Sequence, residues 1–300
     1  MKRKRAKSET WLIITTMIIP VYAFVLFYIV PNLSGFFMGF LNPQGKLTLD
    51  NFRQVYQMMS ASASDLRIGF KNTFLAFGLT FILYPFRFLV SYFLYKKIPG
   101  HGLYRVLFML PGLMVGTAIA LVISQLLAPT GFIAEWVGKI NGLNYVPELL
   151  ADSRFANKTL YLYMIWMGFP GDLILWGGTL ARIPQELIEA GRIDGTNWIT
   201  ECTKIVIPLV WPMVGLHMVL MFCGIFGNGA PAFVMTRGEY GTMTFPCWLT
   251  LQMLAGGGSN YGSGTLNVMS AVGLCVTMIA VPLSLFVRRV AGKLFTEVEF

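Results

Sequence analysis

The sequence predicts an all-α integral membrane protein with six transmembrane helices. Hydrophobic residues make up 55% of the 300 residues and charged residues only 12%, against roughly 25% charged residues in soluble domains. The apolar residues also gather in runs of about 20, the length of helix that crosses the hydrocarbon core of a bilayer. Because a soluble domain of this size could not bury so much apolar surface, we expect residues 1–300 to form one transmembrane domain.

The six predicted spans cover residues 12–30, 73–95, 106–127, 159–181, 213–235 and 267–287. The first apolar run, of about 19 residues, is longer than the core of a signal peptide and no small-residue cleavage site follows it, so we expect it to be retained. Pro20 breaks this span and Pro31 closes it. In the third span, the spacing of Gly112 and Gly116 is typical of helices that approach one another closely. The fourth span is interrupted at residues 168–171, Gly-Phe-Pro-Gly.

The basic residues predict how these spans are oriented. Six spans place both termini on one side of the membrane, and the segments on that side carry more Lys and Arg than the opposite segments. Such residues accumulate in cytoplasmic loops. We therefore expect both termini and the loop 182–212 to lie in the cytoplasm. Orientation in the membrane also explains the net charge of +9 better than a nucleic-acid partner does.

The loop between the fourth and fifth spans is a dense polar stretch in an apolar chain. Pro184 suits the first turn of a helix, and Gly195 suits the left-handed residue that ends one. Thr196 or Asn197 can cap a second short helix, which Pro208 and Pro212 then end before the fifth span. The pattern predicts two short helices that project from the membrane. On local pattern alone, a helical linker remains an equal alternative.

The same loop resembles a known family. Residues 189–195, Glu-Ala-Gly-x-x-Asp-Gly, and residues 205–208, Ile-x-Ile-Pro, are similar to the cytoplasmic "EAA" loop in permease subunits of bacterial binding-protein-dependent ABC importers. The chain departs from that pattern at Gly191, Thr196 and Cys202, where the family usually has Ala, Ala and an aromatic residue.

Further motifs resemble carbohydrate-uptake permeases of the maltose and glycerol-phosphate type, and together they cover nearly the whole chain. They are Gly-x-Leu-x-x-Ile-Pro-Gln-Glu-Leu at 178–187, Leu-Asp-Asn-Phe at 49–52 ahead of Asn72-Thr73, Tyr104-Arg105 followed by Leu110-Pro111, and the prolines Pro20 and Pro31.

The resemblance implies the type I ABC importer permease fold in a bacterial inner membrane. It also implies four partners: a second homologous permease, two ATPase subunits and an extracytoplasmic solute-binding protein. The first loop helix would act as a coupling helix against an ATPase, and Glu189 would hold the two loop helices together by hydrogen bonds. The implied coupling residues are Glu189, Ala190, Gly191, Asp194 and Gly195.

We expect this chain itself to be no enzyme. It contains no G-x-x-x-x-G-K-[ST] phosphate loop, so ATP and Mg²⁺ are expected on the partner ATPases and no cofactor on this chain. No catalytic cluster is visible in the spans. Four widely spaced cysteines and two distant histidines predict no metal site.

Two charged residues fall inside the predicted spans. Arg87 lies 9 residues before Lys96, and Asp172 lies 10 before Arg182. At about 1.5 Å per residue, both are roughly 13–15 Å from the cytoplasmic side. Because charges in a bilayer usually pair or line a cavity, one hypothesis is that they approach each other. The alternative is that Arg87 reaches toward the interface while Asp172 faces a water-filled pathway.

The substrate class is less strongly marked. Trp166, Phe169, Asp172 and Trp176 fall within roughly a third of the fourth helix's circumference, and aromatic faces with a few polar groups suit sugar rings. Packing against neighbouring spans is the simpler interpretation. Asn228, at the broken end of the fifth span, is a further candidate. A carbohydrate is the first expectation, and another polar solute such as glycerol phosphate or a polyamine is the alternative. An ion-driven secondary transporter is the alternative from a different class.

Overall fold

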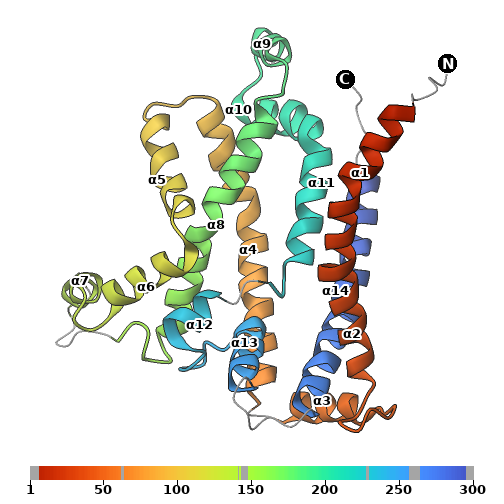
Figure 1. Ribbon diagram of the computed structural model, residues 1–300. Coiled ribbons are helices and arrows are strands. Elements are labelled where there is room, and N and C mark those ends of the chain that lie inside the picture. Colours follow the sequence, from red (N-terminus) through yellow and green to blue (C-terminus); the bar gives the residue numbers. More distant parts are fainter. Residues whose placement is uncertain are drawn as a thin grey trace. The chain divides into compact units, whose positions relative to one another are not determined.

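The computed structural model describes residues 7–61, 64–140, 142, 148–227, 230–256 and 264–294. In these ranges the regular structure is helical, and extended backbone pairs only in an isolated bridge between Leu41 and Leu47. The predicted all-α class is confirmed. The chain divides into two compact units, whose helices are shown in Figure 1. The terminal unit comprises Met1–Met59 and Gly256–Thr277, and the central unit comprises Ser60–Ala255 and Met278–Phe300.

Four described helices are long and apolar enough to cross a membrane: Thr15–Gly39, Asp65–Tyr95, Trp198–Cys223 and Thr265–Lys293. A bent pair of helices in the region of the predicted third span would make a fifth. Helix α8 (Ala156–Leu180) forms over the fourth predicted span, and its 25 residues are long enough to cross a bilayer. It is not among the four helices that are both long and apolar enough. The sixth span therefore remains a prediction.

In the terminal unit, the first span is one continuous helical segment. It consists of α1 (Lys7–Phe24), a π-helical turn (Val25–Ile29) and α2 (Val30–Gly39). Pro31 lies in the first turn of α2, where a helix tolerates the missing N–H. The prediction that Pro31 closes the span is wrong, because the wider π turn comes before the proline and the helix resumes with it.

Asparagine side chains fasten the end of α2 to its neighbours in the terminal unit. The unit also contains α3 (Asp50–Ser60) and the first part of α14 (Gly264–Leu294). Asn51 of α3 donates hydrogen bonds to the carbonyls of Gly39 and Leu41, at 2.9 Å each. Asn267 of α14 donates to the same Leu41 carbonyl. Helices α3 and α14 are thereby both attached to the backbone at the end of α2.

The central unit is organised around α4 (Asp65–Tyr95) and α8, which pack side by side, and α5 (His101–Leu113) also packs on α8. Gly112 of α5 permits this close approach, because a Cβ there would overlap Pro170 of α8. Gly116, the other residue of the predicted small pair, meets nothing within 4 Å of its Cβ position. Among the described residues, Gly112 alone of the pair therefore makes a close helix contact.

The third predicted span is bent. After α5, Met114 and Val115 adopt extended backbone angles, and α6 (Gly116–Leu127) leaves at 104° to α5. These two residues interrupt the helical hydrogen bonds, which the apolar composition of the run could not reveal. Beyond α6, the central unit contains α7 (Phe132–Ile140), α12 (Ala230–Thr236) and α13 (Phe245–Gly256).

The polar loop after α8 begins with a separate helix, α9 (Gln185–Ile193), which projects from one end of the central unit (Figure 1). The sequence predicts that the second loop helix ends before the fifth span. In the structure it does not end there. It continues through α10 (Trp198–Thr200), a π turn (Glu201–Val206) and α11 (Ile207–Cys223). Pro208 again lies in the first turn of the α-helix that follows a π turn. The fifth span is therefore shifted toward the N-terminus, from 213–235 to Trp198–Cys223.

A buried apolar cluster joins the loop to the spans. Its members come from α4, α8, the loop and α11. They are Tyr84, Phe88, Tyr92, Trp176, Leu180, Ile183, Ile188, Cys202, Val206, Val210 and Val214. Because both loop helices contribute to one core with the spans, the loop is part of the central unit's packing. This distinguishes it from a linker that lies free in solvent.

Candidate functional site

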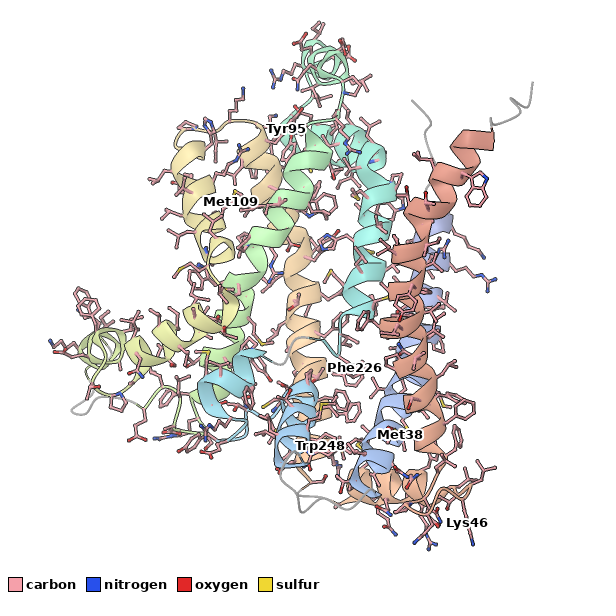
Figure 2. The ribbon with its side chains drawn as sticks, viewed as in Figure 1. Met38, Lys46, Tyr95, Met109, Phe226 and Trp248 are labelled. Atoms are coloured by element: carbon pink, nitrogen blue, oxygen red, sulfur yellow. The ribbon has the colours of Figure 1, made fainter. Side chains whose placement is uncertain are left out.

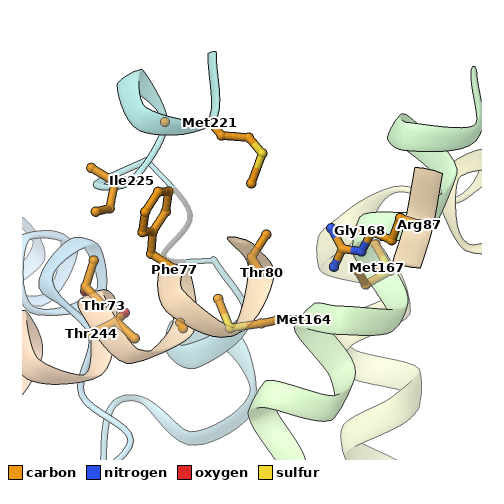
Figure 3. Close-up of a pocket in the computed structure, with 12 residues that line it drawn as sticks. Thr73, Phe77, Thr80, Arg87, Met164, Met167, Gly168, Met221, Ile225 and Thr244 are labelled. Atoms are coloured by element: carbon orange, nitrogen blue, oxygen red, sulfur yellow. The ribbon is translucent and has the colours of Figure 1, made fainter. Parts of the chain in front are cut away.

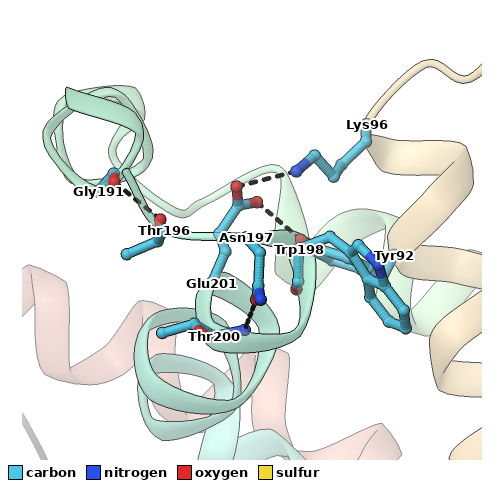
Figure 4. Close-up of polar contacts among 8 residues, drawn as sticks. All are labelled: Tyr92, Lys96, Gly191, Thr196, Asn197, Trp198, Thr200 and Glu201. Carbon is cyan, nitrogen blue, oxygen red and sulfur yellow. Dashed lines mark hydrogen bonds and ion pairs between the residues drawn. The ribbon is translucent and has the colours of Figure 1, made fainter. Parts of the chain in front are cut away.

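The two loop helices meet at a tight turn. Gly195 has φ +74°, which residues with a Cβ rarely adopt. The hydroxyl of Thr196 donates to the Gly191 carbonyl at 2.7 Å, and the side chain of Asn197 caps the second helix by accepting from the Thr200 N–H at 2.8 Å (Figure 4). A Cβ at Gly191 would lie 2.7 Å from Ile205. A larger residue at this position would have to displace the end of the Ile205 side chain, so Gly191 allows the two helices to pack closely.

The outer face of α9 is free within the described chain. Glu189 and Ala190 are exposed, and Glu189 has no hydrogen bond to any described residue. The expectation that Glu189 holds the two loop helices together is therefore wrong, because Thr196 and the close packing at Gly191 do so. Ile188 faces the buried cluster, whereas Ile193 is 85% exposed. The helix is anchored by one face and presents the other.

A buried carboxylate connects the second loop helix to the end of α4. Glu201 is 2% exposed. It accepts hydrogen bonds from the Tyr92 hydroxyl at 2.7 Å and from the Lys96 ammonium at 2.8 Å (Figure 4). Gln185 of α9 donates to the Tyr95 hydroxyl at 2.7 Å, and Figure 2 shows Tyr95 at the end of α4 nearest α9. Both loop helices are thus attached to the last turn of α4.

A second polar cluster lies deeper in the central unit and joins three helices. Arg87 of α4 donates from Nη1 to Asp172 of α8 at 3.1 Å, and both side chains are buried. His217 of α11 places Nε2 3.3 Å from the other carboxylate oxygen of Asp172. Arg87 also donates to the Ile165 carbonyl at 3.1 Å. The structure therefore brings together the two charged residues that the sequence singles out, and adds a histidine.

The Arg87 guanidinium is closely packed on the side that faces α8. Gly168 faces the guanidinium so closely that a Cβ there would overlap it. The ring of Phe169 lies 5.5 Å from the guanidinium carbon, within the range of a cation–π contact. A guanidinium held by a carboxylate, a carbonyl and an aromatic face has its charge well compensated inside an apolar helix bundle.

A cavity of about 250 Å³ lies beside Arg87 (Figure 3). Its wall combines the ring of Phe77, the hydroxyls of Thr73, Thr80 and Thr244, and the buried side of Arg87. The Nε of Arg87 has no hydrogen-bond partner among the described residues. The cavity thus offers an aromatic surface and several hydrogen-bonding groups, which is the mixture that binding sites for polar ligands use.

The predicted pathway residues of α8 mostly point into the protein. Phe169, Asp172 and Trp176 are all buried, and Trp176 packs against Phe88 and His217. Trp166 is partly exposed. Asn228 lies outside the described residues. The simpler interpretation, packing against neighbouring spans, therefore describes the positions of Phe169 and Trp176 in this structure.

Comparison with known proteins gives a consistent set of relatives. The chain is 24% identical to the probable ABC transporter permease protein YesP of Bacillus subtilis, over 92% of this chain and 90% of that protein. It is 22% identical to the multiple sugar-binding transport system permease protein MsmF of Streptococcus mutans, over 83% and 86%. Both relatives are transporter permeases, and the name of MsmF specifies sugar transport. The family resemblance that the sequence indicates is confirmed.

Two further comparisons extend this result. Half of the chain is 30% identical to the maltose/maltodextrin permease protein MalF of Vibrio vulnificus, and the match spans only 28% of that longer relative. A crystal structure of a bacterial ABC transporter that imports the acidic polysaccharide alginate aligns with a TM-score of 0.80, at 17% identity, over 97% of this chain and 98% of that one. The fold is therefore that of an ABC importer permease. No family model matches the chain.

Proposed function

We propose that the chain is the membrane-spanning permease subunit of an ATP-driven importer. It forms part of the translocation pathway for a sugar or oligosaccharide that a solute-binding protein delivers. The names of MalF and MsmF support the substrate class. A related crystal structure contains the alginate transporter together with an alginate-bound periplasmic protein, which supports a binding-protein partner.

One observation carries the proposal: α9 is anchored to the spans on one face and bare on the other. Its buried side joins the apolar cluster through Ile188, and Gln185 ties it to α4. Its exposed side presents Glu189 and Ala190. A helix held in this way can pass a push from a docked partner to the spans, because packed interiors transmit displacement with little compression.

The partner at this face would be an ATPase subunit. Glu189, Ala190, Gly191, Asp194 and Gly195 would form the coupling region, in which the exposed residues meet the ATPase and the glycines shape the turn. Two such ATPases would supply ATP and Mg²⁺ and perform the hydrolysis, so this chain remains non-catalytic. A second homologous permease would complete the pathway.

In the membrane, we propose α8 as the sixth span, with both termini and the loop in the cytoplasm of a bacterial inner membrane. The cavity beside Arg87 would contact the solute during its passage. Its size and its mixture of Phe77 and threonine hydroxyls support a sugar ring as the occupant. Trp166 and Asn228 would lie along the same pathway, whereas Phe169, Asp172 and Trp176 would shape its wall from within.

Co-purification tests this proposal. The chain, expressed in a native bacterial host with its partners and extracted mildly, should carry an ATPase whose turnover rises with a sugar-loaded binding protein. Stimulation by a loaded polyamine- or glycerol-phosphate-binding protein alone would establish the related alternative. Purification without an ATPase, with no response to ATP, would establish the ion-driven transporter.

A matched pair of variants sharpens the test. Gly195 and Gly45 both have φ +74°, and neither has a neighbour within 4 Å of its Cβ position. Valine at either position therefore adds similar backbone strain, but only Gly195 lies in the proposed coupling loop. We expect Gly195→Val to lower transport per ATP hydrolysed, while Gly45→Val leaves this ratio unchanged. Equal ratios for the two variants would argue against coupling through this loop.

A further inference from the structure

The last turn of α4 concentrates its polar contacts on the loop. Within five residues, Tyr92 and Lys96 bind Glu201 of the second loop helix, and Tyr95 binds Gln185 of the first. Phe93 adds a ring contact with Trp198, at 5.4 Å between centroids. The two loop helices, which follow α4 by about a hundred residues in the sequence, are thus both held at the last turn of α4.

Burying the carboxylate of Glu201 beside the last turn of α4 is energetically unfavourable. Glu201 is as buried as the apolar residues beside it, Cys202 and Val206, and burying a charge is unfavourable unless it is paired and hydrogen-bonded. Apolar residues of similar volume often stabilise such a position equally well or better. Stability alone therefore does not account for a charged residue at position 201. The hydrogen bonds that Glu201 accepts from two donors do fix the direction of the second loop helix.

The same two helical segments meet again at the deeper cluster. Arg87 lies five residues before Tyr92 on α4, and His217 lies sixteen after Glu201 on the continuous segment Trp198–Cys223. Asp172 of α8 contacts both Arg87 and His217. Polar contacts therefore hold α4 and the fifth span at two levels, and part of the apolar cluster lies between them.

We propose that Glu201, Tyr92 and Lys96 form a positioning latch that makes α4 move with the loop. This inference rests on the proposed coupling function. Through the latch, displacement of α9 and the second loop helix reaches α4, and α4 carries it to Arg87 and the cavity wall. None of the three residues touches a solute; they act by keeping the angle between the loop and α4 fixed.

The decisive variant is the double replacement Lys96→Met with Glu201→Leu. It removes both charges and fills the site with apolar side chains, so the protein should remain folded and close to the wild-type unfolding temperature. A purely structural role then predicts normal transport. The latch predicts that transport per ATP hydrolysed falls at least about tenfold, the factor that corresponds to losing one charge-assisted hydrogen bond. Lys96→Arg, which keeps the charge and donors, should retain most of the coupling.

The control is a second Lys–Glu pair in the chain. Lys139 and Glu135 of α7 form an ion pair at 2.7 Å in which both side chains are exposed, and the hydrogen bond from Lys139 lowers the pKa of Glu135. The same double replacement there, Lys139→Met with Glu135→Leu, should leave transport per ATP unchanged. Tyr92→Phe provides a milder test that removes one hydrogen bond and no charge, and should lower the ratio by a smaller factor.

A measurement on the chain alone separates the latch from the coupling function. In lipid nanodiscs without partners, amide hydrogen exchange in α9 and in the segment Trp198–Val206 should rise at least about tenfold in the Lys96→Met, Glu201→Leu variant. Faster exchange without a co-purifying ATPase would retain the latch and reject the proposed function. Exchange and transport per ATP both within twofold of wild type would overturn the latch.

Discussion

The buried contact between Arg87 and Asp172 leads to a quantitative prediction. Asp172→Asn keeps the shape of the side chain and removes its charge, so Arg87 is left with neutral partners, among them the Ile165 carbonyl and the Phe169 ring. His217 also loses its anionic neighbour. The guanidinium cannot turn toward solvent easily, because Arg87 is 4% exposed and Gly168 closes one side.

Removing one partner of a buried ion pair costs about 3–5 kcal/mol, because the remaining charge stays uncompensated. For a chain of this size, that loss lowers the apparent unfolding temperature by on the order of 10 °C. Arg87→Gln should produce a similar drop. The double variant removes both charges and should recover a large part of the loss, with a coupling free energy of at least about 2 kcal/mol in the double-mutant cycle.

The assay is thermal unfolding in nanodiscs, followed by circular dichroism at one heating rate for all variants. Asp152→Asn serves as a control, since Asp152 contacts Arg154 at 2.6 Å, the Arg154 side chain is 70% exposed, and loss of such a solvent-screened pair should leave the unfolding temperature unchanged. If Asp172→Asn and Arg87→Gln each unfold within about 2 °C of wild type, the reasoning on the buried pair is refuted. Strictly additive losses in the double variant would refute the direct contact.

Three smaller predictions follow from local packing. Gly168→Ala should lower stability by about 1–3 kcal/mol, because its Cβ would displace the Arg87 guanidinium; the unfolding temperature measures this, and an unchanged value would contradict the contact. Gly112→Ala should destabilise by a similar amount through overlap with Pro170, whereas Gly116→Ala should be neutral in the same assay; equal effects would show that the glycine contact is misplaced. Asn197→Ala removes the cap on the Thr200 N–H and should cost about 1 kcal/mol, seen as faster amide exchange at 198–201; unaltered exchange there would rule out the cap.

Much of the architecture is visible in the sequence, because it follows from composition and short motifs. Apolar runs of the right length predict the membrane helices, and the Gly195 turn follows from a residue type that favours positive φ. The continuation of helices past prolines could not be predicted from composition or short motifs. At Pro31 and Pro208, a π turn before the proline lets the helix continue, and this depends on packing that a local pattern does not contain.

The polar contacts, too, could be predicted from the sequence only in part. With the fifth span placed at 213–235, His217 would lie near its edge. The helix instead begins at Trp198, so His217 lies nineteen residues along it and reaches Asp172. Glu201 counted only as one acidic residue of a loop, because its burial depends on how the end of α4 packs. Charged residues at matching depths in different spans are the signal that finds Arg87 and Asp172, and correct helix limits would have added His217.

ATP-driven uptake is the central claim, and one transport measurement tests it most directly. Proteoliposomes that contain the chain with its co-purified partners would be loaded with ATP or with a non-hydrolysable analogue, and given radiolabelled oligosaccharide with the solute-binding protein outside. We predict uptake only when hydrolysable ATP and the binding protein are both present. Uptake without ATP, driven by a proton or sodium gradient and independent of the binding protein, would contradict the assignment as an ABC importer permease.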